Sequence, residues 1–190
     1  MKRLETVKKS LKPGKVYHRA DLTEWSASVD RDLQELVRDG TLEKLAGGLY
    51  YVPRQTAFGK APADVNVLVS AFLKDDQFVV VSPNDYNGLQ VGTTQLYNER
   101  RVYNHKRHGI FKLGNRTFHF VRKQFVPKKV TPEFLLVDLV NQARNLAEDQ
   151  PKLLDNVKKR AGNMDVRKLK KLAHAFGTVG TRKFFDSFLA

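Results

Sequence analysis

The chain has 190 residues and a net charge of +14, because 34 Lys and Arg side chains outnumber 20 Asp and Glu side chains. It contains no cysteine, which excludes disulfides, thiolate catalysis and cysteine-based zinc sites. A hydrophobic fraction of 41% is typical of a folded protein. The basic balance favours a polyanionic partner: DNA, RNA or an anionic membrane surface. The chain shows no signal-peptide pattern and no apolar run long enough to span a bilayer, so we expect a cytoplasmic protein without membrane contact.

The positive charge is distributed unevenly along the chain. The net charges of successive segments are +3 for residues 1–56, −2 for residues 57–96, +9 for residues 97–130 and +4 for residues 131–190. Most of the excess therefore lies outside the first segment.

The first residues have the pattern of two short helices separated by an extended piece. Apolar residues recur at helical spacing in residues 4–11, and Pro13-Gly14 ends that helix. Residues 15–17, "KVY", are expected to be extended. Residues 19–25, "RADLTEW", are long enough for two helical turns.

Residues 26–40 predict a longer helix, for which Ser26 is the expected N-cap. Gly40 is placed to end it with a positive φ. Its apolar stripe has the spacing i, i+4, i+7 and i+8 and consists of Val29, Leu33, Leu36 and Val37. In residues 41–53, two β-prone runs flank Gly47-Gly48, which predicts a hairpin. This order of elements predicts a winged helix-turn-helix, with the hairpin as its wing.

The face of the predicted recognition helix opposite the stripe is polar and centres on Arg31. Arg can donate two hydrogen bonds to guanine, and Gln can pair with adenine, whereas phosphate contacts fix the position of the protein on the duplex. The predicted DNA contacts are base contacts by Ser28, Arg31 and Gln34, and phosphate contacts by Arg38, Lys44 and Arg54.

Acidic residues on the same helix leave a second interpretation open. Asp30, Asp32 and Glu35 would repel phosphates, and three helices with a hairpin also serve as protein-interaction modules. A winged-helix protein-interaction module is therefore the alternative, and it predicts no salt-dependent binding of nucleic acid.

Residues 57–190 are expected to form a second domain, after a linker-like stretch of Pro, Gly and small residues at 53–64. Residues 63–73 predict a helix, residues 77–81 a short buried strand, and Gly114-Asn115 a hairpin turn. Further helices are expected to start at Ser82, Thr131, Asp149 and Thr178. The predicted fold class is α+β: a winged helix-turn-helix in residues 1–56, then a mixed α+β antitoxin or regulatory domain with a helical C-terminal end.

Two basic runs in the second domain form a predicted secondary basic surface. Such runs serve as phosphate-tracking surfaces, as sites for a partner protein, or as solvated helix faces, and all three remain open. Tyr97 and Tyr103 lie in the first run, so an RNA-binding protein that stacks bases on these rings is another alternative. The residues of this surface are Arg100, Arg101, Lys106, Arg107, Lys158, Lys159, Arg160, Arg167, Lys168, Lys170 and Lys171.

No pattern in the chain makes a convincing catalytic or metal site. His105 and His108 have a ligand-like spacing, but the cationic residues between them disfavour a metal ion. Residues 176–184, "FGTVGTRKF", lack the Gly-Lys-Ser/Thr ending of a phosphate loop. Ser82 has no His and Asp context. We expect a protein that is not an enzyme and that has no catalytic residue, no cofactor and no metal.

The run "SASVDRDLQELVRDGTLEKLAGGLYYVP" resembles the N-terminal winged helix of AbiEi-type antitoxins, the regulatory halves of AbiE toxin–antitoxin pairs. "AFGKAP" resembles the family's linker, and "GLQVGTTQ" and "AFGTVGTRKFFDSFL" resemble its second domain more loosely. The resemblance implies a DNA-binding autorepressor of inverted repeats upstream of its own operon. It also implies an antitoxin that opposes a nucleotidyltransferase toxin without binding it stably. The matching positions are Val29, Arg31, Leu33, Leu36, Gly40, Leu42, Gly48, Tyr50 and Pro53.

Overall fold

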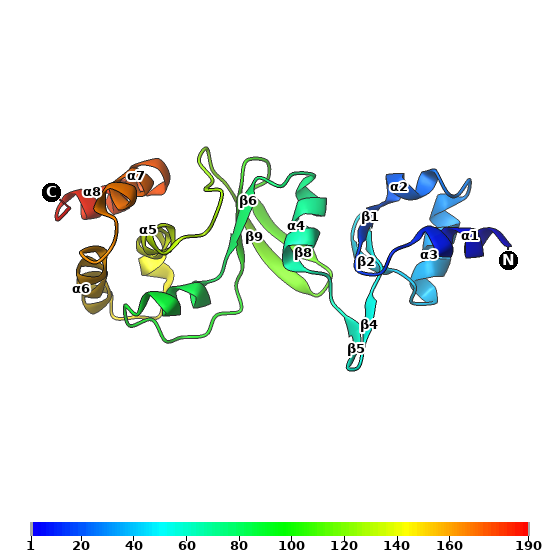
Figure 1. Cartoon of the computed structure of the whole chain (residues 1–190), viewed down its shortest axis with the longest axis horizontal. Helices are drawn as coiled ribbons and strands as arrows, with labels where there is room; N and C mark the ends of the chain where they lie inside the picture. Colours follow the sequence, from blue (N-terminus) through cyan, green and yellow to red (C-terminus); the bar gives the residue numbers. More distant parts are fainter. Residues whose placement is uncertain (1, 190) are drawn as a thin grey trace. The chain divides into compact units, whose positions relative to one another are not determined.

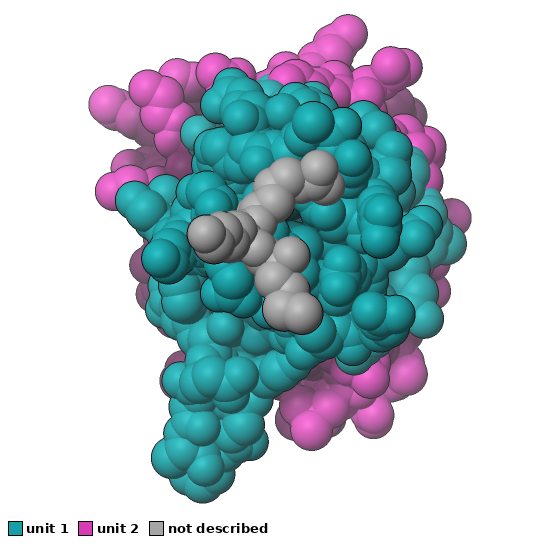
Figure 2. Space-filling model, turned by 90° about the vertical axis from the view of Figure 1, so that its right-hand side faces the viewer, with its two compact units in different colours: residues 1–76, 110–118 teal, residues 77–109, 119–190 magenta. Residues whose placement is uncertain are grey.

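A computed structural model describes residues 2–189 of the chain. It divides into two compact units: unit 1 comprises the residues up to Asp76 together with Ile110–Phe118, and unit 2 comprises Gln77–Gly109 and the residues from His119 onward (Figure 2). The chain is mixed α and β with a helical C-terminal end, as the sequence predicts. Among the described residues, no helix combines the length and the apolar character needed to cross a membrane.

Unit 1 begins with three helices and three strands in the order α1–β1–α2–α3–β2–β3 (Figure 1). The strands form an antiparallel sheet with the order β1–β3–β2. The predicted hairpin is confirmed, with its turn at Gly47 and Gly48. The bounds are α1 Lys2–Ser10, β1 Val16–His18, α2 Arg19–Thr23, α3 Val29–Arg38, β2 Glu43–Ala46 and β3 Leu49–Tyr51.

Helix α3 forms where its apolar stripe meets the core of unit 1. Leu33 and Leu36 are almost completely buried there, together with Leu22 of α2 and Val7 of α1. The helix ends as predicted, because Gly40 adopts φ +76°, a conformation that residues with a Cβ rarely adopt.

The predicted N-cap of α3 is wrong by two residues. The helix starts at Val29, and Ser28 occupies the N-cap position without a side-chain cap bond. Ser26 is buried instead: its hydroxyl donates to the Asp32 carboxylate at 2.5 Å and accepts the backbone N–H of Ser28 at 3.1 Å. A buried carboxylate such as Asp32 needs a hydrogen-bond donor, and Ser26 supplies it. The two bonds of the Ser26 hydroxyl fix the loop between α2 and α3.

A second hairpin stands where the sequence suggests a linker. Strands β4, Arg54–Thr56, and β5, Gly59–Ala61, pair antiparallel. Gly59 adopts φ +101°, which permits the tight turn. Figure 1 shows this ribbon extending away from the rest of unit 1.

The remaining part of unit 1 consists of a helix and a further hairpin. Helix α4 spans Val65–Leu73, and strand β8 spans Gly109–Leu113. Strand β9, Arg116–Arg122, begins in unit 1 and continues into unit 2. The predicted turn at Gly114 between β8 and β9 is confirmed. Phe72 of α4 contacts Phe111 of β8, with ring centroids 5.2 Å apart.

Unit 2 combines a small sheet with a group of helices. Strand β7 pairs antiparallel with β6 and parallel with the last part of β9. The predicted caps are confirmed, because the side chains of Ser82, Thr131, Asp149 and Thr178 each accept a backbone N–H at the start of a helix. The bounds are β6 Phe78–Val81, η1 Pro83–Leu89, β7 Arg101–Asn104, α5 Pro132–Gln142, η2 Ala143–Asn145, α6 Gln150–Ala161, α7 Val166–Phe176 and α8 Val179–Asp186, where η marks a 3₁₀ helix.

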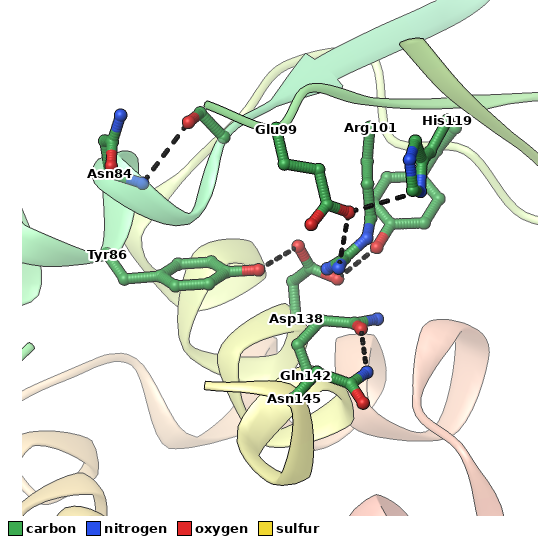
Figure 3. Close-up of polar contacts among 10 residues, drawn as sticks. Asn84, Tyr86, Glu99, Arg101, His119, Asp138, Gln142 and Asn145 are labelled. Carbon is green, nitrogen blue, oxygen red and sulfur yellow. Dashed lines mark hydrogen bonds and ion pairs between the residues drawn. The ribbon is translucent and has the colours of Figure 1, made fainter. Parts of the chain in front are cut away.

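A buried carboxyl group joins three elements of unit 2. Asp138 of α5 is completely buried and accepts hydrogen bonds from the hydroxyls of Tyr86, at 2.7 Å, and Tyr103, at 2.5 Å (Figure 3). Burial raises the pKa of Asp138 and outweighs the lowering effect of the two tyrosine donors. Helix α5, strand β7 and the 3₁₀ helix η1 are therefore joined by two hydrogen bonds to one carboxyl group within an apolar core.

Candidate nucleic-acid interface

Helix α3 exposes the face that the sequence analysis assigns to DNA. Arg31, Gln34 and Arg38 are exposed, and so is Ser28, which directly precedes the helix. The opposite face is occupied by the buried stripe, so these side chains cannot turn into the core. The α3 face thus offers guanidinium and amide donors along about two helical turns.

A groove of about 250 Å³ brings three of the predicted residues together. Gln34 and Arg38 line it from α3, and Lys44 lines it from β2. Tyr50 of β3, directly opposite Lys44 in the sheet, also lines the groove. The apolar lining comes from Leu33 and Val37. We call this feature the α3–hairpin groove; it places two cations beside an apolar floor.

A second groove, of about 550 Å³, lies at the start of α3. Ser28 and Arg31, the other two predicted residues of this helix region, line it. Its remaining lining includes Arg19 and Thr23 of α2 and Asp30 of α3. The structure therefore distributes the predicted contacts of α3 over two neighbouring grooves.

The three acidic residues that argued against DNA binding are paired with a cation or buried. Asp30 forms a two-point ion pair with Arg19, in which Nε donates to Oδ1 at 2.6 Å and Nη2 donates to Oδ2 at 2.7 Å. Hydrogen bonds from Arg19 lower the pKa of Asp30 below its ordinary value. Asp32 is buried against Ser26. Glu35 is half-buried and lies 3.8 Å from Arg38.

Arg54, the sixth predicted contact, lines neither groove. It is exposed on β4, and its guanidinium group lies over the backbone of Gly14. A phosphate contact by Arg54 therefore belongs to the β4–β5 hairpin rather than to the α3 face.

The first basic run of the secondary surface is only partly exposed. Arg101 lies below the surface: its side chain is 11% exposed and pairs with Glu99 at 2.7 Å (Figure 3). Tyr103 is buried among aromatic rings, with centroids 4.8 Å from Phe176. The expectation that Tyr103 stacks on RNA bases is therefore wrong, because a stacking platform must be open to the base.

The turn after β7 presents the other cations of this run. Lys106 and Arg107 are exposed, and the Asn104 side chain accepts their backbone N–H groups at 2.8 and 2.6 Å. Nδ1 of His105 lies 2.9 Å from the carbonyl oxygen of Lys123. Arg100 is half-buried. The buried Asn104 thus fixes the turn that presents the two side chains.

The second basic run lies at the end of α6 and along α7. Arg167 and Lys171 are exposed, one helical turn apart. Lys168 pairs with Glu133 at 2.7 Å, and Lys158 lies 3.8 Å from Asp155. The others differ in exposure: Lys159 is exposed, whereas Arg160 and Lys170 are half-buried.

Arg19 and Tyr50 were not among the predicted DNA contacts. Tyr50 lies between the buried Leu49 and Tyr51 and therefore on the opposite face of the hairpin. The run "LYYV" has no apolar–polar alternation that would reveal this face from the sequence. Arg19 and Asp30 lie 11 positions apart on two different helices, so no local pattern predicts their ion pair. Across residues 2–189, no three His, Asp or Glu side chains are grouped closely enough to hold a metal ion.

Comparison with known proteins identifies a fold and no family. The chain is similar to the crystal structure of the RV2827C protein from Mycobacterium tuberculosis, with a TM-score of 0.64 and 15% sequence identity. The similarity covers 100% of this chain and 76% of that chain. At this identity the likeness concerns the fold alone. No family model and no curated protein matches the chain.

Proposed function

We propose that this chain is a DNA-binding transcriptional autorepressor and an antitoxin that opposes a nucleotidyltransferase toxin. Residues 1–56 act as the winged helix-turn-helix, with α3 as recognition helix and the β2–β3 hairpin as wing. The order α1–β1–α2–α3–β2–β3 and the sheet order β1–β3–β2 support this interpretation. The antitoxin role rests on the resemblance of residues 26–53 to AbiEi-type antitoxins.

The observation that carries the DNA-binding proposal is the polar face of α3. Arg31 is exposed at its centre, and Gln34 and Arg38 continue it into a groove shared with Lys44. Asp30 is paired with Arg19, and Asp32 is buried against Ser26, so neither carboxylate is presented on the polar face of α3. Arg31 and Gln34 have the donors that base edges require, and Lys44 has the charge that phosphate requires.

The first test is a fluorescence-anisotropy titration at near-physiological salt. The probes are the duplex upstream of this protein's own gene and a scrambled duplex of the same length. We expect selective binding that Arg31→Ala weakens by roughly 1–3 kcal/mol with relaxed specificity, whereas Lys44→Ala weakens both duplexes equally. Equal binding of both duplexes by the wild-type protein would contradict sequence reading by α3.

The antitoxin proposal has a separate test in cells. A nucleotidyltransferase-like reading frame beside this gene is expressed with and without the full chain, and growth is measured. We expect the chain to relieve growth inhibition. Inhibition that persists while the chain is present at equal or greater abundance would contradict the antitoxin role and leave the DNA-binding proposal intact.

A further inference from the structure

The β4–β5 hairpin ends in a phenylalanine that the protein leaves uncovered. Phe58 has an exposed fraction of 101%. A single apolar side chain on a surface needs no explanation by itself. Phe58, however, is part of the turn of a ribbon that projects from unit 1 (Figures 1 and 2).

The turn that carries Phe58 is ordered by one hydroxyl group. Oγ1 of Thr56 donates to the carbonyl oxygen of Gly59 at 2.8 Å and accepts the backbone N–H of Phe58 at 3.3 Å. The aromatic ring is therefore presented on a closed turn, so its backbone needs little further ordering when it binds.

The base of the hairpin is fastened to the end of α3. Nζ of Lys60 donates to the carbonyl oxygen of Gly40 at 2.7 Å, directly after the helix. The hydroxyl of Tyr51 donates to the carbonyl oxygen of Ala61 at 3.1 Å. The β4–β5 hairpin is thus held at the C-terminal end of the proposed recognition helix.

The turn of the other hairpin is tied to the opposite end of the same helix. The backbone N–H of Arg19 donates to the carbonyl oxygen of Gly48 in the β2–β3 turn at 2.8 Å, and its side chain binds Asp30 in the first turn of α3. The β2–β3 turn and the β4–β5 hairpin are therefore tied to opposite ends of α3.

The charge of the β4–β5 hairpin identifies the kind of partner that it suits. Residues 54–63 contain Arg54 and Lys60 and no acidic residue. Double-stranded DNA suits these groups, because its backbone phosphates would attract the two cations and its stacked bases would contact the aromatic ring. A second copy of this positively charged unit offers no such charge complement.

We propose that the β4–β5 hairpin is a second DNA-binding arm, which enters the minor groove and wedges Phe58 between two base pairs. This inference rests on the proposed binding of duplex DNA by α3. The next groove beside a major groove is a minor groove, and the ribbon extends about 10 Å, enough to cross one strand of the backbone. Apolar wedges at such positions unstack one base step and bend the duplex.

The test uses the full chain, the selected duplex and 2-aminopurine, a base whose fluorescence rises when it is unstacked. The probe is placed in turn at each step flanking the α3 site. We expect the wild-type protein to raise fluorescence at one step. Phe58→Ala should abolish that rise and weaken binding about tenfold, which is within the range for loss of one base–aromatic stack.

Control variants make the result specific to the arm. Because Phe58 is uncovered, Phe58→Ala should leave the melting temperature unchanged, and Phe58→Trp should keep the fluorescence rise. Ile110→Ala removes another exposed apolar side chain of unit 1 and should change neither signal. Arg54→Ala, at the exposed cation of β4, should lower the slope of log affinity against log salt by about one.

The other outcomes overturn the inference in distinguishable ways. If Phe58→Ala binds and unstacks DNA like the wild type while Arg31→Ala loses affinity, the arm does not contact bases and the proposed function stands. If Phe58→Ala instead reduces the number of copies bound per duplex in sedimentation, with no change at any base step, the ring contacts a second copy. If the wild-type protein binds no duplex selectively, the proposed function fails first.

Discussion

At the residue scale, the ion pair between Arg19 and Asp30 decides what charge α3 presents at its first turn. Asp30 lies in the same groove as Arg31, at the end of the helix where DNA is proposed to approach. With both oxygens bonded to Arg19, its carboxylate offers little repulsion to a phosphate. Arg19 is thus a positioning residue for the proposed reading face.

Arg19→Ala should weaken binding of the upstream duplex several-fold, because Asp30 then stands unpaired beside Arg31. The same substitution in an Asp30→Asn background should have little effect, because the repelling charge is gone. Both side chains are exposed, so the melting temperature should not change in either protein. Equal losses of affinity in the two backgrounds would show that Arg19 acts through another contact; anisotropy titrations of the four proteins decide this.

Asp39, just after α3, makes the stability of unit 1 depend on pH. Partial burial would raise the pKa of Asp39, but hydrogen bonds from Lys8 and Thr41 outweigh it and lower the pKa to about 2 from 3.8. A depressed pKa adds stability above pH 4, which is lost as the pH falls from about 4 through 2.

Asp39→Asn should therefore reduce stability at neutral pH by about 1 kcal/mol, after allowance for solvent screening of this partly exposed pair. The loss should shrink as the pH approaches 2, where about half of the wild-type carboxyl is itself protonated. Urea unfolding at pH 7, 4 and 2 measures the difference. A loss that is the same at all three values would exclude the ion pair with Lys8 as its source.

At the element scale, the contact of Tyr86 and Tyr103 with Asp138 fixes η1 and β7 against α5. Tyr103→Phe should destabilise unit 2 by about 1–3 kcal/mol, since a buried carboxyl loses a donor that water cannot replace. Tyr97→Phe is the matched control. Its half-buried hydroxyl accepts only the backbone N–H of Ala147, at 2.9 Å, and its removal should cost less. Thermal unfolding compares the loss of stability in the two variants. A larger loss for Tyr97→Phe than for Tyr103→Phe would contradict this role of the Asp138 contact.

Local patterns predicted most elements of this fold, and non-local contacts explain what they missed. The buried stripe of α3, the Gly40 stop and the caps at Thr131 and Asp149 follow from neighbouring residues alone. The role of Ser26 depends on the burial of Asp32, which no local rule gives. Residues 53–64 were predicted to be a linker because Pro and Gly are common both in linkers and in hairpin turns. This segment is ordered by the pairing of β4 with β5 and by the hydrogen bond from Lys60 to Gly40.

The candidate site was predictable to a similar extent. The helical period placed Arg31, Gln34 and Arg38 on one exposed face, which the structure confirms. The sequence did not reveal that Arg101 and Tyr103 are covered, because β7 is buried on both faces: Val102, Tyr103 and Asn104 are all buried. A strand of four residues carries too little periodicity to show how it is buried.

At the scale of the whole molecule, most of the positive charge lies outside residues 1–56. If unit 2 adds phosphate contacts, Arg167→Glu together with Lys171→Glu should weaken operator and scrambled duplexes by the same factor. The slope of log affinity against log salt should fall by about two. Lys152→Glu is the control, because Lys152 is exposed and lies on α6, whereas Arg167 and Lys171 lie on α7. Unchanged affinity and slope would assign the basic face of α7 to solvent or to a protein partner.

The central claim is that Arg31 of α3 reads a base, and a double-mutant cycle tests it most directly. Every base pair of the selected duplex is replaced in turn, and each duplex is titrated with the wild-type protein and with Arg31→Ala. The account predicts one position at which replacement costs the wild type about 1–3 kcal/mol and costs Arg31→Ala almost nothing. If Arg31→Ala is as sensitive as the wild type at every position, Arg31 makes no base contact and α3 is not the reading helix.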